Sequence, residues 1–203
     1  MNNVDNNLEK IAHFLEAVRP MQITERFPKK PDGTRENDAE HSWALCMSIL
    51  AMETELKKEF GPDINIERML KLALVHDLGE VDPGDIPTWE KAEKQDQASL
   101  ERACVQRLAS ILPLPAAKTI ADLWEECEAK ETLEAKIVKS LDRLDPVIHR
   151  VAFSQGWAGG PYSDLAELDS IQMERHSFSE TLVELYEIMR AKILSRNLLQ
   201  RKY

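Results

Sequence analysis

The residues with the clearest chemical potential are a histidine–aspartate pair, His76 and Asp77, at the end of an apolar stretch. Neighbouring side chains on a straight helix point about 100° apart, because an α-helix has about 3.6 residues per turn. Both can reach one ion only if the helix stops there, and Gly79 and Pro83 follow as helix breakers. Imidazole nitrogen with carboxylate oxygen suits a divalent transition metal better than calcium, which prefers all-oxygen ligands.

Carboxylates crowd the segment that follows this apolar stretch. Within nine residues the chain has Asp77, Glu80, Asp82 and Asp85. A His-Asp pair by itself is more often the end of one helix beside the cap of the next element. A carboxylate cluster, however, repels itself unless it is fully solvated or faces a cation. The cluster therefore favours the metal interpretation.

Two further residues could complete such a site. His41 lies in the first turn of a helix that we expect to open near Asn37, where a side chain can project into a cleft. A lone histidine there is more often a surface or capping residue. Asp142 lies beside Leu141 within an expected helix, although helix propensity gives no reason for aspartate there. Its side chain is either exposed and paired with Lys139 or buried against a cation.

The spacing of apolar residues predicts helices along the whole chain. We expect them near residues 5–19, 38–60, 66–76, 90–111, 120–127, 131–144, 164–175 and 179–197, with a short one starting at Pro146. Residues 21–37 contain two prolines and a glycine and are expected to form a loop, either a solvated basic loop or a phosphate-facing lid. No convincing β-alternation is present. The prediction is an all-α fold of about eight to nine helices.

The composition narrows the class of protein. A chain of 203 residues with 43% hydrophobic residues fits one domain with a real core. The net charge of −10 argues against a binder of duplex nucleic acid, which normally has a basic face. No apolar run reaches the roughly 20 residues of a membrane span, and no signal peptide is visible. Three scattered cysteines indicate a reducing compartment, so we expect a cytoplasmic protein.

The order His, His-Asp, Asp on a helical background resembles the metal signature of the HD-domain phosphohydrolases. Three longer motifs, at residues 35–43, 76–85 and 139–146, are similar to those of the 5′-deoxynucleotidase-related branch. The resemblance covers about the first 160 residues. It implies a single HD-type domain over residues 1–203, a helical bundle whose core spans about 5–160, with C-terminal helices at about 164–200.

The resemblance also implies roles for particular residues. One divalent metal ion would be ligated by His41, His76, Asp77 and Asp142. The acid/base carboxylates would be Glu80 and Asp85. The phosphate-binding arginine would be Arg26, and its aromatic neighbour Phe27, where the family usually has tryptophan.

Elementary chemistry agrees with these roles. Two histidines and two aspartates leave positions free on a six-coordinate ion, and Mn, Fe, Co, Zn or Mg could occupy such a shell. A carboxylic acid that protonates a poor alkoxide leaving group accelerates hydrolysis, and Glu80 is three residues beyond Asp77. Arg26 supplies a bidentate cation that a net-acidic enzyme needs for a phosphate.

These observations lead to a functional hypothesis. We expect a metal-dependent phosphomonoesterase acting on small nucleotides, with 5′-deoxynucleoside monophosphates as substrates. The partner would be a small-molecule phosphate ester, and the protein a homodimer. One alternative is an HD hydrolase of another phosphate ester or diester. The other is a non-catalytic helical interaction domain with a structural metal.

Overall fold

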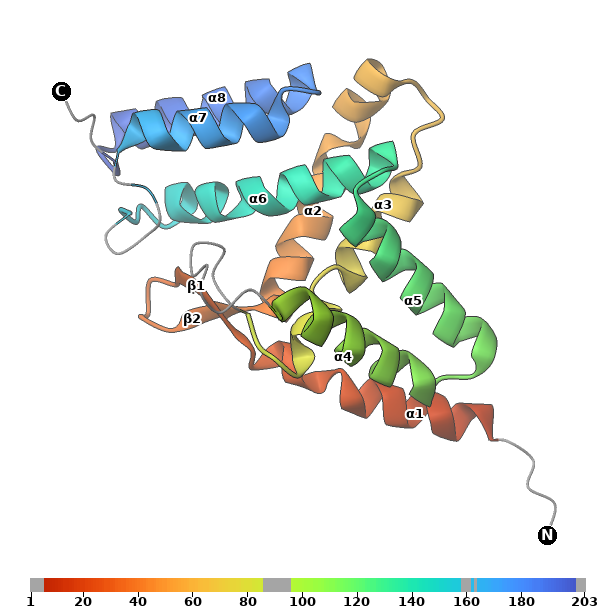
Figure 1. Ribbon diagram of the computed structural model, residues 1–203. Helices are drawn as coiled ribbons and strands as arrows, with labels where there is room; N and C mark the ends of the chain where they lie inside the picture. Colours follow the sequence, from red (N-terminus) through yellow and green to blue (C-terminus); the bar gives the residue numbers. More distant parts are fainter. Residues whose placement is uncertain (1–5, 86–95, 158–161, 163, 200–203) are drawn as a thin grey trace, which may run out of the picture.

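Helices dominate the structure, a computed structural model that describes residues 6–85, 96–157, 162 and 164–199 (Figure 1). The α-helices are α1 (Asn7–Ala17), α2 (Asp38–Phe60), α3 (Ile66–Val75), α4 (Gln97–Ile111), α5 (Leu114–Ala129), α6 (Leu133–Ala152), α7 (Leu165–His176) and α8 (Glu180–Ser195). Two short 3₁₀ helices, η1 (Arg19–Gln22) and η2 (Leu78–Val81), and two strands, β1 (Glu25–Lys29) and β2 (Arg35–Asn37), complete the described elements. The prediction of an all-α fold with about eight to nine helices is confirmed.

The start and end of α2 are set by local chemistry. The Asn37 side chain accepts a hydrogen bond from the backbone N–H of Glu40, and the Glu40 carboxylate accepts one from the backbone N–H of Asn37. This reciprocal capping box satisfies two backbone donors that a helix start leaves free. At the other end Gly61 has a φ of 95°, which glycine adopts easily. The cap places His41 in the first turn.

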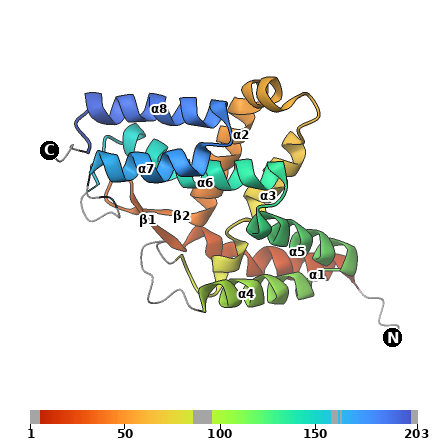
Figure 2. The same ribbon diagram turned by 45° about the horizontal axis from the view of Figure 1, so that its top comes forward.

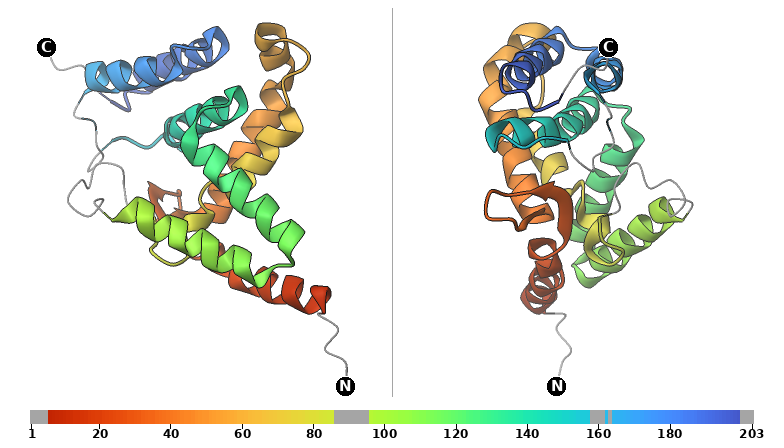
Figure 3. Two further views of the ribbon diagram at one scale, coloured as in Figure 1. Left: turned by 45° about the vertical axis from the view of Figure 1, so that its right-hand side comes forward. Right: turned by 90° about the vertical axis from the view of Figure 1, so that its left-hand side faces the viewer.

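Two clusters of buried apolar side chains meet along α6. The first joins α2, α3, α5 and the first half of α6, with Leu45, Leu72, Trp124 and Leu141 among its members. The second lies between the other half of α6 and α7 and α8, and includes Leu144 and Tyr186. Figure 2 shows α7 and α8 running along α6, and Figure 3 shows α4 and α5 gathered toward the N-terminal side. Asp142 therefore lies where the two clusters adjoin.

The expected loop at residues 21–37 is instead a short hairpin, so that prediction is wrong. Strands β1 and β2 pair antiparallel, with Glu25 opposite Asn37. The Arg35 guanidinium donates hydrogen bonds to the carbonyls of Arg26 and Phe27, which fastens the two strands together. Strands of five and three residues with charged side chains carry too short a pattern for alternation to be seen in sequence.

The expected break at Pro146 is also absent, because α6 continues through it to Ala152. Pro146 has no N–H to donate to the carbonyl of Asp142, which costs the helix about 3 kcal/mol. Val147 and Val151 are buried in the second cluster, and burying two such side chains returns roughly the same free energy. Apolar burial therefore carries α6 past its proline.

Helix α5 is longer than predicted, because it begins at Leu114 instead of near Ile120. Pro115 lies in its first turn, where a missing N–H costs nothing. The predicted start of α4 near Glu90 lies outside the described residues, and the helix is present from Gln97. Among the residues that the structure describes, no helix combines the length and apolar character needed to cross a membrane.

Gly79 is the point at which η2 passes closest to α4. A Cβ atom at this position would lie 2.7 Å from the Cβ of Glu101 and 3.1 Å from its Cα and carbonyl oxygen. We therefore expect Gly79→Ala to lower the free energy of unfolding by about 1–3 kcal/mol, the usual cost of overpacking. Thermal denaturation followed by circular dichroism measures this. An unchanged melting temperature would show that η2 moves away from α4 without cost.

Candidate metal centre and active site

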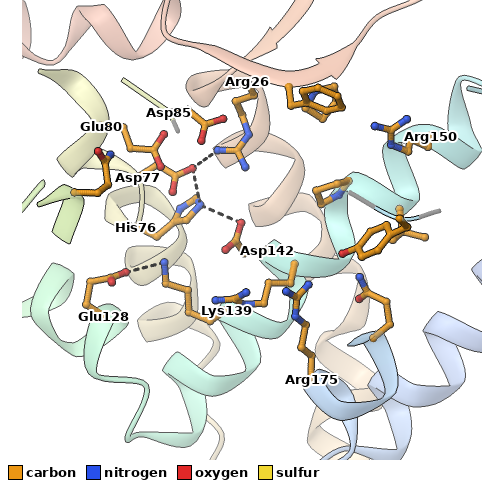
Figure 4. A pocket seen from close by; sticks show the side chains of 18 of the residues that line it. Arg26, His76, Asp77, Glu80, Asp85, Glu128, Lys139, Asp142, Arg150 and Arg175 are labelled. Atoms are coloured by element: carbon orange, nitrogen blue, oxygen red, sulfur yellow. Dashed lines mark hydrogen bonds and ion pairs between the residues drawn. The ribbon is translucent and has the colours of Figure 1, made fainter. Parts of the chain in front are cut away.

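Side chains from three helices meet in one buried cluster. His41 comes from the first turn of α2, His76 caps the C-terminus of α3, Asp77 follows it, and Asp142 comes from α6. Figure 4 shows His76, Asp77 and Asp142 pointing toward one another. Both imidazole rings are fully buried. Because α3 ends at Val75, the adjacent side chains of His76 and Asp77 can face the same point.

The distances between these atoms fit one small cation. His41 Nε2 lies 3.0 Å from Asp142 Oδ1, and His76 Nε2 lies 3.0 Å from Asp77 Oδ2. The cross distances are 3.8 Å from His41 Nε2 to Asp77 Oδ2 and 3.7 Å from His76 Nε2 to Asp142 Oδ1. Two ligand atoms that lie about 2.1 Å from one ion, at right angles, are about 3 Å apart. The structure therefore brings all four expected ligands to one point.

The hydrogen bonds of both rings turn Nε2 toward this point. His76 Nδ1 lies 2.7 Å from the carbonyl oxygen of Ala73, so Nδ1 carries the proton and donates it there. Its Nε2 is buried and has no hydrogen-bond partner. His41 Nδ1 lies 2.9 Å from Asp145 Oδ2. Carboxylate and carbonyl partners of this kind orient metal-binding histidines in proteins. A buried imidazole nitrogen that faces two carboxylates and has no hydrogen-bond partner fits the role of a metal ligand.

The charge state of the cluster also suits a cation. Burial and Arg26 lower the pKa of His41, but hydrogen bonds to Asp142 and Asp145 outweigh them and raise it to about 10. Burial raises the pKa of Asp142, and its contacts with His41 and His76 outweigh this and lower it well below its usual range. The Asp142 carboxylate is therefore ionised, which suits the binding of a cation.

The hairpin places Arg26 against this cluster. Its Nη1 lies 2.6 Å from Asp77 Oδ2, 3.6 Å from Asp38 Oδ1, and its Nε lies 3.7 Å from Glu36 Oε2. Nε itself is buried and makes no hydrogen bond. The neighbouring Phe27 lines the same cavity. Both residues that were expected to bind substrate thus reach the cavity that holds the His/Asp cluster.

In the acidic segment after His76, two side chains line the cavity and one lies on the outer surface. Glu80 and Asp85 line the cavity near Arg26 (Figure 4). Burial, together with the charges of Asp77 and Asp85, raises the pKa of Glu80 well above its usual value. Asp82 turns outward and accepts two hydrogen bonds from Arg107, at 2.6 and 2.8 Å.

The cavity has a volume of about 340 Å³, at the lower end of the range for small-molecule sites. The sequence left open whether Lys139 pairs with Asp142. Its Nζ instead lies 2.8 Å from a carboxylate oxygen of Glu128.

The profile of the HD domain family matches residues 21–178, which include all of these residues. This chain belongs to the HD domain family.

One relative of this HD-domain chain is the 5′-deoxynucleotidase HDDC2 of Xenopus laevis. The two sequences are 35% identical over 109 residues, and this stretch covers 54% of this chain and 52% of that protein. The 5′-deoxynucleotidase YfbR of Escherichia coli is 30% identical over 139 residues, 66% of this chain and 69% of that protein. The chain thus spans about half to two thirds of the length of these curated relatives. The crystal structure of a predicted metal-dependent phosphohydrolase from Magnetospirillum magnetotacticum superposes with a TM-score of 0.78 at 27% identity, covering 96% of this chain and 98% of that one.

Two buried carboxylates of this HD domain were not anticipated from sequence. Asp145 orients His41, and its position three residues after Asp142, on the same face of α6, is a signal that could have found it. Asp38 is fully buried, and neither of its carboxylate oxygens has a hydrogen-bond partner. Burial and Asp77 raise its pKa to about 7, against the opposing charge of Arg26. Nothing in the sequence distinguishes Asp38 from an ordinary first-turn helix residue.

Proposed function

We propose that this chain is a metal-dependent phosphomonoesterase that hydrolyses 5′-deoxynucleoside monophosphates to deoxynucleosides and phosphate. The observation that carries the proposal is the convergence of His41, His76, Asp77 and Asp142 on one point beside Arg26 and Glu80. Further support comes from relatives that are named 5′-deoxynucleotidases.

One divalent ion is proposed at the His/Asp cluster. Such an ion would lower the pKa of water and offset the charge of a phosphate group. Two nitrogen and two oxygen donors are compatible with Mn, Fe, Co, Zn or Mg, so the donor set does not select among them. Asp145 and the carbonyl of Ala73 hold the two imidazole rings in the orientation that this role requires.

The proposed binding of the phosphate rests on Arg26. The guanidinium has five N–H donors in a fixed plane, and among the described residues only Nη1 makes a side-chain hydrogen bond, to Asp77. Its remaining donors include the buried Nε without a partner. Burial lowers the pKa of Arg26, but the charges of Asp77 and Asp85 outweigh it and raise this pKa well above its usual value, so the guanidinium stays charged. Arg26 is therefore suited to hold a phosphate oxygen in register with the cluster.

The proposed proton transfer rests on Glu80, with Asp85 beside it. Breaking the bond between phosphorus and the 5′-oxygen leaves an alkoxide, a poor leaving group unless it gains a proton. Because burial and two neighbouring aspartates raise the pKa of Glu80, its carboxyl favours the protonated form that can donate. Asp85, whose pKa burial also raises, shares the same part of the cavity.

A substrate panel tests the proposal. Purified protein supplemented with each candidate metal would be assayed on 5′ and 3′ monophosphates, on deoxy and ribo sugars, and on a phosphodiester. We expect 5′-deoxynucleoside monophosphates to have the highest kcat/KM among the substrates of this panel. Faster cleavage of the diester would favour the alternative HD hydrolase. Stoichiometric metal without any hydrolysis would favour a structural metal in a non-catalytic domain.

Arg26→Lys is expected to lower kcat/KM by about 10–100-fold, because lysine replaces a bidentate donor with a single point charge. Lys29→Ala and Lys30→Ala are matched controls on the same hairpin. Lys29 is exposed, and Lys30 pairs with Glu40 at 2.8 Å, so neither should change kcat/KM by more than about twofold. Equal losses in all three variants, abolished by added salt, would reduce the hairpin to an electrostatic funnel without a special role for Arg26.

A further inference from the structure

The walls of the cavity differ in charge. Asp77, Glu80 and Asp85 lie on the side of α3 and η2, whereas α6 and α7 contribute Arg143 and Arg175. In Figure 4 Arg175 reaches into the cavity from the side opposite Arg26. A protein with a net charge of −10 thus concentrates cations on one wall of its candidate active site.

Four arginines line this cavity, and two of them already have partners. Arg26 pairs with Asp77 at 2.6 Å. Arg150 donates a hydrogen bond to the carbonyl of Gly156 and lies 5.0 Å from the centre of the Trp157 ring. In the parts of the chain that the structure describes, no carboxylate forms an ion pair with Arg143 or Arg175. Arg175 has a hydrogen-bond contact with the Tyr162 side chain, but neither of these two guanidinium groups is neutralised by a carboxylate, and both face the cavity.

Arg143 and Arg175 line the same cavity, and the charge of one acts on the other. Burial and the positive charge of Arg143 lower the pKa of Arg175, against smaller contributions from Tyr162 and Asp142 that raise it. Two guanidinium groups that repel each other in a half-buried position are unfavourable unless an anion joins them. Both arginines line the same cavity as Asp142, so this pair faces the space beside the His/Asp cluster. Its position suits an anion that belongs to the same substrate molecule.

We infer that Arg143 and Arg175 form a second anion subsite, and that the substrate is a nucleotide with a second phosphoryl group in addition to the one that is hydrolysed. The inference rests on the proposed phosphomonoesterase activity of this site and extends its substrate from a nucleotide with one phosphoryl group to a nucleotide with two. Arg26 would hold the reacting phosphoryl group, and the arginine pair on the opposite wall would hold the other. Planar guanidinium groups bind phosphate oxygens bidentately, which suits this task better than lysine would.

The reaction itself stays a hydrolysis. Water forms the new bond to phosphorus, the bond from phosphorus to the nucleotide oxygen breaks, and that oxygen takes up a proton. The products are inorganic phosphate and a nucleotide that retains its second phosphoryl group. No oxidant, reductant or further reactant is required.

The test compares substrates that differ by one phosphoryl group. The metal-supplemented full chain would be assayed on 5′-dAMP, deoxyadenosine 3′,5′-bisphosphate and dADP, which also distinguishes the two positions of the second group. We expect one of the two doubly phosphorylated nucleotides to exceed 5′-dAMP in kcat/KM by about tenfold or more, as a charge-assisted bidentate contact allows. Arg143→Gln and Arg175→Gln should each reduce this ratio toward one.

Arg102→Gln is the matched control. It removes the same charge from α4, where Arg102 is half-exposed and pairs with Glu125 at 2.7 Å, so the ratio should be unchanged. Circular dichroism checks that each variant is folded. Equal kcat/KM for all three nucleotides, or a preference that survives both cavity substitutions, would overturn the subsite while hydrolysis of 5′-dAMP still supports the proposed function.

A different pattern would count against the proposed function. If none of the three nucleotides is hydrolysed, that function fails, and binding decides the fate of the subsite. Isothermal titration calorimetry would then compare the affinity for the same three nucleotides in the wild type and in Arg143→Gln and Arg175→Gln. Tighter binding of a doubly phosphorylated nucleotide that both variants lose would retain the subsite. Equal affinities would remove it.

Discussion

Replacement of His76 or Asp77 by alanine is expected to abolish metal binding and hydrolysis while the protein remains largely helical. His76 has one nitrogen committed to the carbonyl of Ala73 and the other unpaired and aimed at the carboxylates, so its loss removes a ligand that no neighbour can supply. Loss of Asp77 removes a second ligand and also leaves Arg26 without its closest ion pair. The helices are held by two apolar clusters that neither side chain joins.

Elemental analysis for bound metal, steady-state turnover and circular dichroism measure the three parts of this expectation. His13→Ala is the matched control, because His13 is an exposed histidine on α1, away from the cavity. It should retain both metal and turnover. Full turnover of His76→Ala under chelator-controlled conditions would refute the assignment of the site.

The residues of the His/Asp cluster could be singled out from sequence because several of their signals are local, and the family resemblance joined them into one expected ligand set. Two adjacent ligands, His76 and Asp77, need a helix break, and Gly79 and Pro83 predict one. Asp142 stood out because it interrupts an apolar helix face without a propensity reason. Each of these signals lies within a few residues, so residue types and spacing are enough to place His76 and Asp77 at a helix end and Asp142 inside a helix.

The features that could not be predicted from sequence depend on contacts between distant segments. Arg143 and Arg175 are 32 positions apart, and only the packing of α7 on α6 brings them together. The hairpin was missed because its strands are held partly by the Arg35 side chain and by a hydrogen bond between His149 Nε2 and the carbonyl of Lys29. The continuity of α6 through Pro146 likewise depends on a second apolar cluster that forms only when α7 and α8 pack on it.

The sequence also could not show which carboxylic acids of the segment after His76 are buried in the cavity. Asp82 and Glu80 are two residues apart, and both are plausible acids in sequence. In the structure Asp82 lies half-exposed against Arg107, whereas Glu80 lies in the cavity between Asp77 and Asp85. That difference in burial gives the two carboxyl groups opposite pKa directions, because a cation lowers the pKa of Asp82 and desolvation raises that of Glu80.

Glu80→Ala is accordingly expected to keep the metal ion and to lose about 10²–10⁴-fold in kcat, the usual contribution of general acid–base help. Glu80 is not among the four groups that converge between α2, α3 and α6, so the ligand set is complete without it. What the substitution removes is a buried carboxyl whose raised pKa favours the protonated form. Without that proton the leaving oxygen departs as an alkoxide. Burial and the charge of Asp77 also raise the pKa of Asp85. Replacement of Asp85 should therefore lower kcat as well, by a smaller factor.

Asp82→Ala distinguishes this role from a general effect of charge. It removes one carboxylate from the same acidic segment, but one that faces Arg107 at the surface, so kcat should change by no more than about twofold. Metal content, measured on the same preparations, separates a lost proton donor from a lost ion. If Glu80→Ala turned over substrate at the wild-type rate with its metal in place, another group would have to protonate the leaving oxygen. Asp85 or Glu101, two other carboxyl groups that line the cavity and have raised pKa values, would then be the groups to replace next.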